Sequence, residues 1–184
     1  HIGYRTYDNG TNVRTFSLKE VRKLTDKIAA VNRKLLSPEM YADGTECTRT
    51  VTPTSNGTTS LHLPDGSKAI RSLAITLSEF DPADLTEIMQ QTWLRIDFDG
   101  TRCVWCPLDC FFGVGTGAPA SSGWYVSSDG KGSFTSRWVM PYAEHADLRL
   151  EKKSDIPFTA VITCYVDDFD RTAQTLYFHA TYHD

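Results

Sequence analysis

Alternating apolar and polar residues occur through most of the chain and predict β-strands. The clearest case is residues 94–98, where apolar and charged residues alternate with the period of two of a half-buried strand. Asp99 and Gly100 follow directly and are a hairpin signal that leads into a second strand, 102–108. Similar patterns predict further strands at residues 2–7, 69–80, 133–140, 146–151, 159–166 and 175–182.

The N-terminal region carries the clearest helical pattern. Apolar residues recur at spacings of three and four from Leu18 to Leu35 and form one stripe along a helix. Ser17 and Glu20 have the spacing of a capping box, in which each side chain bonds the backbone N–H of the other residue. Pro38 disfavours helical geometry at the residue before it. We therefore expect one amphipathic helix over residues 18–36 that packs on a sheet or closes one end of it.

The remaining segments have the composition of loops. Residues 40–68 are rich in Thr, Ser, Gly, Asn and Pro, which is typical of a long loop or of a pair of short edge strands. This segment is the best candidate for an insertion. A second loop-like stretch, 113–132, contains Trp124 and Tyr125. The order of the elements predicts a mainly β fold, an antiparallel jelly-roll sandwich with one helix near the N-terminus, in a single domain over residues 1–184.

Composition and charge exclude several classes of partner. The net charge of −4 and the pI near 5.7 argue against a nucleic-acid partner, which would favour a basic face. No apolar run approaches the roughly 20 residues that a membrane-spanning helix needs, so no membrane partner is expected. The first residues lack the charged and apolar regions of a signal peptide, and the start at His1 predicts a processed or excised chain.

The cysteines do not predict a cofactor. Cys103 and Cys106 have the spacing of a zinc or redox pair, but positions three apart on a strand point to opposite faces. We expect packed, reduced thiols, with one disulfide or a bound metal as the alternatives. We predict neither a metal site nor another cofactor. The five cysteines are Cys47, Cys103, Cys106, Cys110 and Cys164.

Histidines and acidic clusters show no catalytic spacing. His179 and His183 share one face of a predicted strand, but they lie about 13 Å apart, too far to hold one ion. Asp97 and Asp99 lie beside a turn, as does the acidic segment 167–170, and neither group has the spacing of a dedicated calcium loop. Turn and edge roles are the simpler interpretation of both groups.

Carboxylates and aromatic residues are the remaining candidates for chemistry. Glycosidic cleavage usually needs two carboxylates, and Glu144 and Glu151 are the nearest candidates in the strand region. The alternation of residues 146–151 is explained by a half-exposed strand alone. Aromatic faces beside polar groups suit sugar binding, although a sandwich core also needs large residues. The aromatic set is Trp105, Phe111, Phe112, Trp124, Tyr125, Trp138 and Tyr142.

Four short motifs occur in a characteristic order along the chain: WLRIDFDG at 93–100, CPLDCFFG at 106–113, MPY at 140–142 and YFHA at 177–180. In this order they resemble a bacterial family once described only as a domain of unknown function and now called glycoside hydrolase family 172. The resemblance is strongest over residues 93–184, fair over 1–36 and weak between. It implies a pair of jelly rolls, assembly as trimers or their multiples, and furanosidase activity on α-D-fructofuranosyl or D-arabinofuranosyl linkages.

The chain departs from the family pattern at three points. Cys110 stands where the family usually has Asp before Phe-Phe-Gly, although Asp109 is adjacent, and Tyr142 replaces a Phe that is common there. The two glutamates of the family lie further along its chain, in Gly-Glu-Gly-type and Gly-Thr-Glu-Asp-Tyr-type motifs, and neither motif occurs here. The chain therefore resembles the middle of such an enzyme, and we assign no catalytic residue.

The leading hypothesis is the jelly-roll portion of a furanosidase-like protein, inactive as an isolated chain. Its expected partners are a furanoside glycan and further copies of the chain, as a trimer or a multiple of it. The alternatives are a non-catalytic assembly module and a carbohydrate-binding module. Both the cytoplasm and the cell envelope or periplasm stay open as compartments. The predicted substrate-binding residues are Trp105, Asp109, Phe111 and Trp138.

Overall fold

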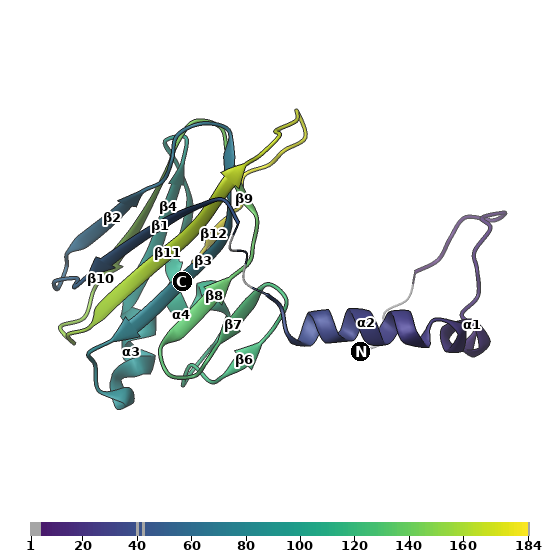
Figure 1. Cartoon of the computed structure of the whole chain (residues 1–184), viewed down its shortest axis with the longest axis horizontal. Coiled ribbons are helices and arrows are strands. Elements are labelled where there is room, and N and C mark those ends of the chain that lie inside the picture. The colour runs from purple at the N-terminus through teal and green to yellow at the C-terminus, as the bar shows by residue number, and fades with distance from the viewer. Residues whose placement is uncertain (1–4, 40, 42, 184) are drawn as a thin grey trace. The chain divides into compact units, whose positions relative to one another are not determined.

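The computed structural model describes residues 5–39, 41 and 43–183. Contacts divide the chain into two compact units, residues 1–34 and 35–184. The single domain over residues 1–184 stays a prediction. The first unit is largely helical and the second is built from strands (Figure 1).

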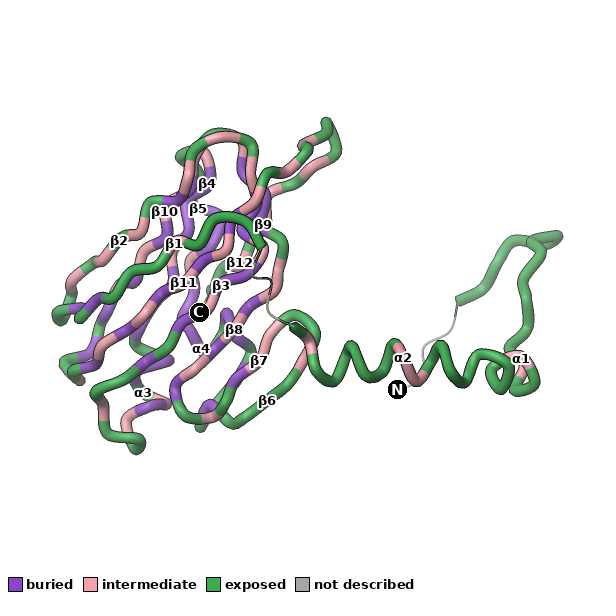
Figure 2. The backbone as a smooth tube through the Cα atoms, in the orientation of Figure 1, coloured by how far each residue is buried: buried purple, intermediate pink, exposed green. Residues whose placement is uncertain are grey.

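The helical segment is interrupted once. The sequence predicted one helix over residues 18–36, whereas the structure has α1 (Leu18–Lys23) and α2 (Thr25–Leu36). Leu24 separates them, with φ −104° and ψ 10°. Neither helix contains a buried residue, and Figure 2 shows both mainly in the colour of exposed positions. The apolar stripe from Leu18 to Leu35 is therefore exposed to solvent.

The predicted capping box does not form. Ser17 is the N-cap residue of α1, but its side chain makes no capping hydrogen bond. Glu20 instead forms an ion pair with Arg14. The first turn is held by backbone bonds, in which the N–H groups of Glu20 and Val21 donate to the Ser17 carbonyl.

Two β-sheets pack together to form the second unit. Sheet A has the order β1-β11-β3-β8-β7-β6, with β9 also beside β3, and sheet B has the order β12-β5-β4-β10-β2. Sheet A consists of β1 (Thr45–Val51), β3 (Lys68–Ser78), β6 (Ser121–Ser122), β7 (Val126–Ser128), β8 (Ser133–Ser136), β9 (Met140–Tyr142) and β11 (Thr159–Asp168). Sheet B consists of β2 (Thr58–His62), β4 (Thr92–Phe98), β5 (Thr101–Pro107), β10 (Ala146–Lys152) and β12 (Ala180–Thr181).

Neighbouring strands in both sheets are antiparallel, apart from the short parallel pair of β12 and β5. The prediction of a mainly β, antiparallel sandwich is confirmed, and the finer jelly-roll assignment stays a prediction. A 3₁₀ turn (Pro82–Asp84) and α3 (Leu85–Gln91) precede β4, and α4 (Leu108–Phe112) follows β5. No helix in the described part of the chain is both long and apolar enough to span a membrane.

One continuous hydrophobic core fills the space between the sheets. Strand β10 shows how the sequence builds it, because Leu148 and Leu150 are fully buried while Arg149 between them is partly exposed. Figure 2 shows buried positions concentrated along β3, β4, β10 and β11. The largest fully buried side chains are Tyr142, Phe98, Phe112, Phe134 and Phe158.

The β4–β5 hairpin contains a bulge that changes the expected position of one cysteine. Ile96 pairs with Val104, but Asp97 pairs with Arg102, which leaves Cys103 as an extra residue on β5. The extra residue shifts the alternation of buried and exposed side chains along β5 by one position. Cys103 and Cys106 are consequently both buried, whereas an uninterrupted strand would place them on opposite faces.

The segments predicted as loops or weak strands have mixed outcomes. Within 40–68, β1 pairs with β11 and β2 pairs with β10 at the edges of the two sheets, which is the edge-strand alternative. Within 113–132, β6 and β7 form a short hairpin. The strand predicted at 175–182 is limited to Ala180–Thr181. Of the strand predicted at 2–7, residues 2–4 lie outside the described residues and 5–7 are not a strand.

Candidate functional site

A cleft of about 340 Å³ lies at one end of sheet B. Antiparallel pairing brings the start of β4, the end of β5 and the end of β10 to this edge, and the segment after β12 arrives beside them. Helices α3 and α4 supply the other wall. The lining residues are Gln90, Gln91, Trp93, Pro107, Asp109, Cys110, Lys153 and Tyr182.

Aromatic side chains form one wall of the cleft and extend beneath it. The rings of Trp93 and Trp105 lie 4.4 Å apart between centroids, and the Tyr182 ring meets Trp93 edge-on at 5.8 Å. The Lys153 ammonium lies 3.5 Å from the centroid of the Trp93 ring, which is favourable because the ring face is electron-rich. Trp105 is held from behind, since its indole Nε1 donates to Glu151 at 3.3 Å.

Backbone hydrogen bonds fix the walls of this cleft. The N–H of Lys153 donates to the Gln91 carbonyl at 2.8 Å and so connects the end of β10 with the end of α3. The N–H of Tyr182 donates to the Trp105 carbonyl at 3.2 Å and holds the C-terminal segment in place. The Asp109 carboxylate accepts the N–H of Cys110 at 2.7 Å. The cleft is thus formed before any ligand arrives, which lowers the entropic cost of binding.

The polar groups of the cleft match the hydroxyl groups of a sugar. Gln90 and Gln91 each offer an amide donor and acceptor, Asp109 offers acceptors and Lys153 offers donors. Aromatic walls with a few polar groups are typical of small-ligand sites. Among the described residues of the lining, Asp109 is the single carboxylate, so these residues do not supply the carboxylate pair of a glycosidase.

The acidic residues of sheet B next to the cleft are held by arginines. Asp97 is buried and receives Arg95 Nε at 3.0 Å and Arg149 at 3.6 Å. The hydrogen bond that Arg95 donates to the Asp97 carboxylate raises the pKa of Arg95. Glu151 lies 4.0 Å from Arg95. These acids form ion pairs with two partly exposed arginines, which explains their presence on the strands without a catalytic role.

The two glutamates considered for catalysis do not meet. Glu144 precedes β10 and Glu151 lies near its far end, so the extended strand separates them by about 20 Å. A retaining pair would need about 5–5.5 Å and an inverting pair no more than about 10 Å.

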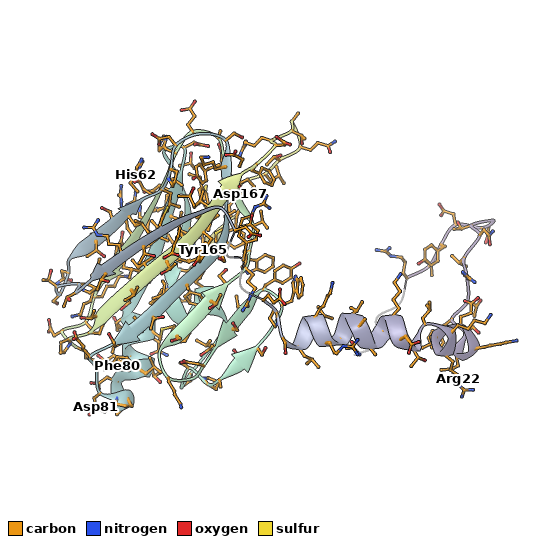
Figure 3. The ribbon with its side chains drawn as sticks, in the orientation of Figure 1. Arg22, His62, Phe80, Asp81, Tyr165 and Asp167 are labelled. Atoms are coloured by element: carbon orange, nitrogen blue, oxygen red, sulfur yellow. The ribbon has the colours of Figure 1, made fainter. Side chains whose placement is uncertain are left out.

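His62, the last residue of β2, is a surface residue that bonds Asp147 at 2.9 Å (Figure 3).

The four predicted substrate-binding residues lie in different places. Asp109 lines the cleft, and Trp105 packs directly against its Trp93 wall. Phe111 is only 7% exposed and packs in the core beside Phe112, with ring centroids 5.1 Å apart. Trp138 lies between β8 and β9 of sheet A, stacked against Tyr125 at 3.8 Å, and does not line the cleft.

The residues of the cleft that the sequence did not indicate include Gln90, Gln91, Trp93, Lys153 and Tyr182. Trp93 occupies the outward register of β4 with Arg95 and Asp97, and that alternation was the available signal. Lys153 and Tyr182 reach the cleft through strand pairing between distant segments, for which the local sequence carries no signal.

The cysteines are all free thiols. Burial raises the pKa of the Cys106 thiol to about 12, and burial raises that of Cys164 as well, so both are poor nucleophiles at neutral pH. Cys110 is exposed and lines the cleft. Within residues 5–39, 41 and 43–183, no three His, Cys, Asp or Glu side chains are grouped as metal ligands.

The fold and the cleft define the class of this protein: a two-sheet β-sandwich with a preformed aromatic and polar cleft at one sheet edge. The chain matches the family described as GH172 domain-like over residues 45–162, more than half of its length, and it belongs to that family. This is a glycoside hydrolase-like family, as the motifs predicted. No curated protein matches the chain.

The limits of the match differ from those of the resemblance seen in the sequence. It begins at residue 45, so β1 and β2, which lie in the segment considered as an insertion, are part of the family domain. It ends at residue 162 within β11, whereas the resemblance was expected to continue to residue 184.

Proposed function

We propose that this chain is the sugar-binding sandwich portion of a glycoside hydrolase-like protein that acts on α-D-fructofuranosyl or D-arabinofuranosyl linkages. The observation that carries this proposal is the cleft that Trp93 and Tyr182 line together with the polar groups of Gln91, Asp109 and Lys153. Membership of the family supports the glycan as the class of ligand. The chain supplies recognition, and the carboxylates that cleave the bond lie outside it.

The chemistry of the cleft supports binding of a sugar ring. A furanose ring presents apolar C–H groups on its faces and hydroxyl groups at its edge. The aromatic wall covers the C–H groups, because apolar contact and the ring quadrupole both favour them. The amides, the carboxylate and the ammonium then bond the hydroxyls and fix the orientation of the ring.

Replacing Trp93 with alanine is expected to weaken furanoside binding by about tenfold or more, because the main apolar wall is lost. Calorimetric titration of the chain with oligosaccharides of D-arabinofuranose and of D-fructofuranose measures the effect. Phe16→Ala, which removes an exposed aromatic ring outside the cleft, is the control and should bind as the unmodified chain does.

Two results would count against this function. Titrations without heat for either furanoside would remove the sugar-binding proposal. Hydrolysis of an aryl furanoside by the isolated chain, abolished by Glu151→Gln, would show that the chain contains its own catalytic carboxylates. We expect no turnover in either form, because Glu151 is committed to Trp105 and Arg95.

A second candidate function, assembly, is favoured by the exposed stripe on α1 and α2. Leu24 is 50% exposed, Ile28 41% and Val31 47%, and an unburied apolar stripe of this kind favours association of helices. We expect the chain to form a trimer that light scattering detects, and Ile28→Asp to shift it to smaller species. A monomer at high concentration would argue against assembly.

A further inference from the structure

A second cleft, of about 280 Å³, shares no residue with the first one. It lies entirely within the β-sandwich unit, beside sheet A. Strand β3, the β6–β7 connection and the segments that flank β1 and β8 meet there. The lining residues are Pro38, Glu39, Tyr41, Arg71, Trp124, Tyr125, Arg137 and Val139.

Arg71 has an unused hydrogen-bonding group in this cleft. Its guanidinium lies 5.9 Å from the centroid of the Tyr41 ring and 5.4 Å from that of Phe169. Its Nε is excluded from water and has no acceptor among the described residues. The nearby carboxylate of Asp167, labelled on β11 in Figure 3, instead accepts the Tyr41 hydroxyl at 2.6 Å. A guanidinium that is held by aromatic rings, and whose Nε has no acceptor among the described residues, is available to bind an anion.

Two aromatic side chains lie open at the same cleft. Tyr125 stacks on Trp138 with an interplanar angle of 3°, which leaves its other face exposed. Trp124 next to it is 46% exposed and makes no ring contact in the described part of the chain. Large exposed aromatic faces are uncommon on a surface without a partner and indicate a binding site.

The second arginine of the cleft has a structural task. Arg137 Nε donates to the Glu39 carbonyl at 3.2 Å, and its terminal nitrogens donate to Ser127 Oγ at 3.2 Å. Its backbone N–H also donates to the Tyr125 carbonyl at 2.6 Å. Arg137 therefore holds the walls of the cleft together. Arg71 is the arginine whose Nε donor has no acceptor among the described residues. Among the described residues of the lining, the two arginines stand against a single acidic residue, Glu39.

We propose that this second cleft binds a saccharide unit that carries a carboxylate, with the acid on Arg71 and the sugar ring on Trp124 and Tyr125. A planar guanidinium pairs with a carboxylate through two parallel hydrogen bonds. The exposed aromatic faces cover the C–H face of the ring. This site is independent of the furanoside cleft, and it would let the chain attach to an acidic glycan while the first cleft holds a neutral one.

Titration of the full chain with tetragalacturonic acid and with its carboxyl-reduced, neutral form tests the proposal. We expect the acid to bind about tenfold more tightly than the neutral form, because only the acid pairs with Arg71. Arg71→Gln should abolish this preference. Arg102→Gln, which removes one positive charge from sheet B, is the matched control and should keep it. Trp124→Ala, at an exposed position, should weaken binding of both sugars.

Several outcomes would overturn the proposal. Equal affinity for the acid and the neutral form, no binding of either, or equal losses in Arg71→Gln and Arg102→Gln would each do so. Displacement of the saccharide by inorganic phosphate at the same concentration would show a simple anion site in its place. Trp93→Ala should keep acid binding and Arg71→Gln should keep furanoside binding, so failure of one site is distinguishable from failure of the other.

Discussion

Replacing Asp99 with asparagine is expected to lower the free energy of unfolding at pH 7 by about 2–3 kcal/mol. Asp99 is the first turn residue of the β4–β5 hairpin and has φ +49°, and Gly100 follows with φ +78°. Both positive φ angles match the turn that favours an Asp-Gly pair. Asparagine also tolerates this backbone conformation, so the substitution removes the charge and keeps the turn.

The Asp99 carboxylate joins three parts of the sandwich. It accepts the backbone N–H groups of Ala143 and Glu144 at 2.7 Å and of His145 at 2.9 Å, all in the β9–β10 connection. The Tyr177 hydroxyl of the C-terminal segment donates to it at 2.7 Å. An asparagine amide would turn a donor toward some of these donors and leave them unpaired, which costs about 1–3 kcal/mol.

The pH dependence separates the charge from the packing. Burial opposes ionisation of Asp99, but the hydrogen bonds from His145, Ala143, Tyr177 and Glu144 outweigh it and lower the pKa from 3.8 to about 2. A lowered pKa in the folded state gives stability that is present above the unfolded pKa and is lost as the pH falls through the folded one. The difference in the free energy of unfolding between the unmodified chain and Asp99→Asn should therefore shrink as the pH falls from about 4 to about 2.

Chemical denaturation at a series of pH values measures this difference. Tyr177→Phe is the partial control, because it removes one of the four hydrogen bonds and should cost about 1 kcal/mol. An Asp99→Asn variant as stable as the unmodified chain at pH 7 would contradict the role of the carboxylate. If the difference in unfolding free energy stays constant down to pH 2, the shape of the side chain, and not its charge, is responsible for the loss of stability.

Replacing Phe112 with alanine is expected to cost about 3–5 kcal/mol and to weaken furanoside binding as well. Phe112 is 1% exposed and lies between the rings of Phe111, at 5.1 Å, and Phe134, at 5.5 Å. Its removal leaves a cavity that these rings only partly fill. The same side chain anchors α4, which carries Asp109 and Cys110 into the first cleft.

Thermal unfolding and the furanoside titration measure the two effects of Phe112→Ala. Phe16→Ala is the control for loss of an aromatic ring, because Phe16 is 74% exposed and its removal should change the stability by less than about 0.5 kcal/mol. A loss of less than about 1 kcal/mol for Phe112→Ala would contradict the packing of α4 on the core. Unchanged furanoside affinity in the folded Phe112→Ala variant would show that α4 does not contribute to the binding site.

Most strands could be predicted because their alternation is local. In β10 the residues Leu148 and Leu150 alternate with charged neighbours, and the strand forms where that pattern places it. The Asp99-Gly100 signal also placed the hairpin correctly. The Cys103 bulge was not predictable, since a bulge depends on the pairing of two strands and each strand alone has an ordinary pattern.

The helix and the site show the limits of local patterns. Apolar spacing from Leu18 to Leu35 predicts a stripe, but it does not show that the stripe is exposed or that Leu24 interrupts the helix. The motif containing Asp109 led to one residue of the first cleft. Trp93, Lys153 and Tyr182 join it through pairing of β4, β5, β10 and β12, which the spacing of residues along the chain does not record.

A crystal structure of the chain with a D-arabinofuranose oligosaccharide tests the central claim most directly. We expect density for a furanose ring between Trp93, Tyr182 and Lys153, with its hydroxyls bonded to Gln91 and Asp109, and an intact glycosidic bond. Density for the sugar at another surface, or a cleaved product beside two carboxylates of this chain, would contradict the account.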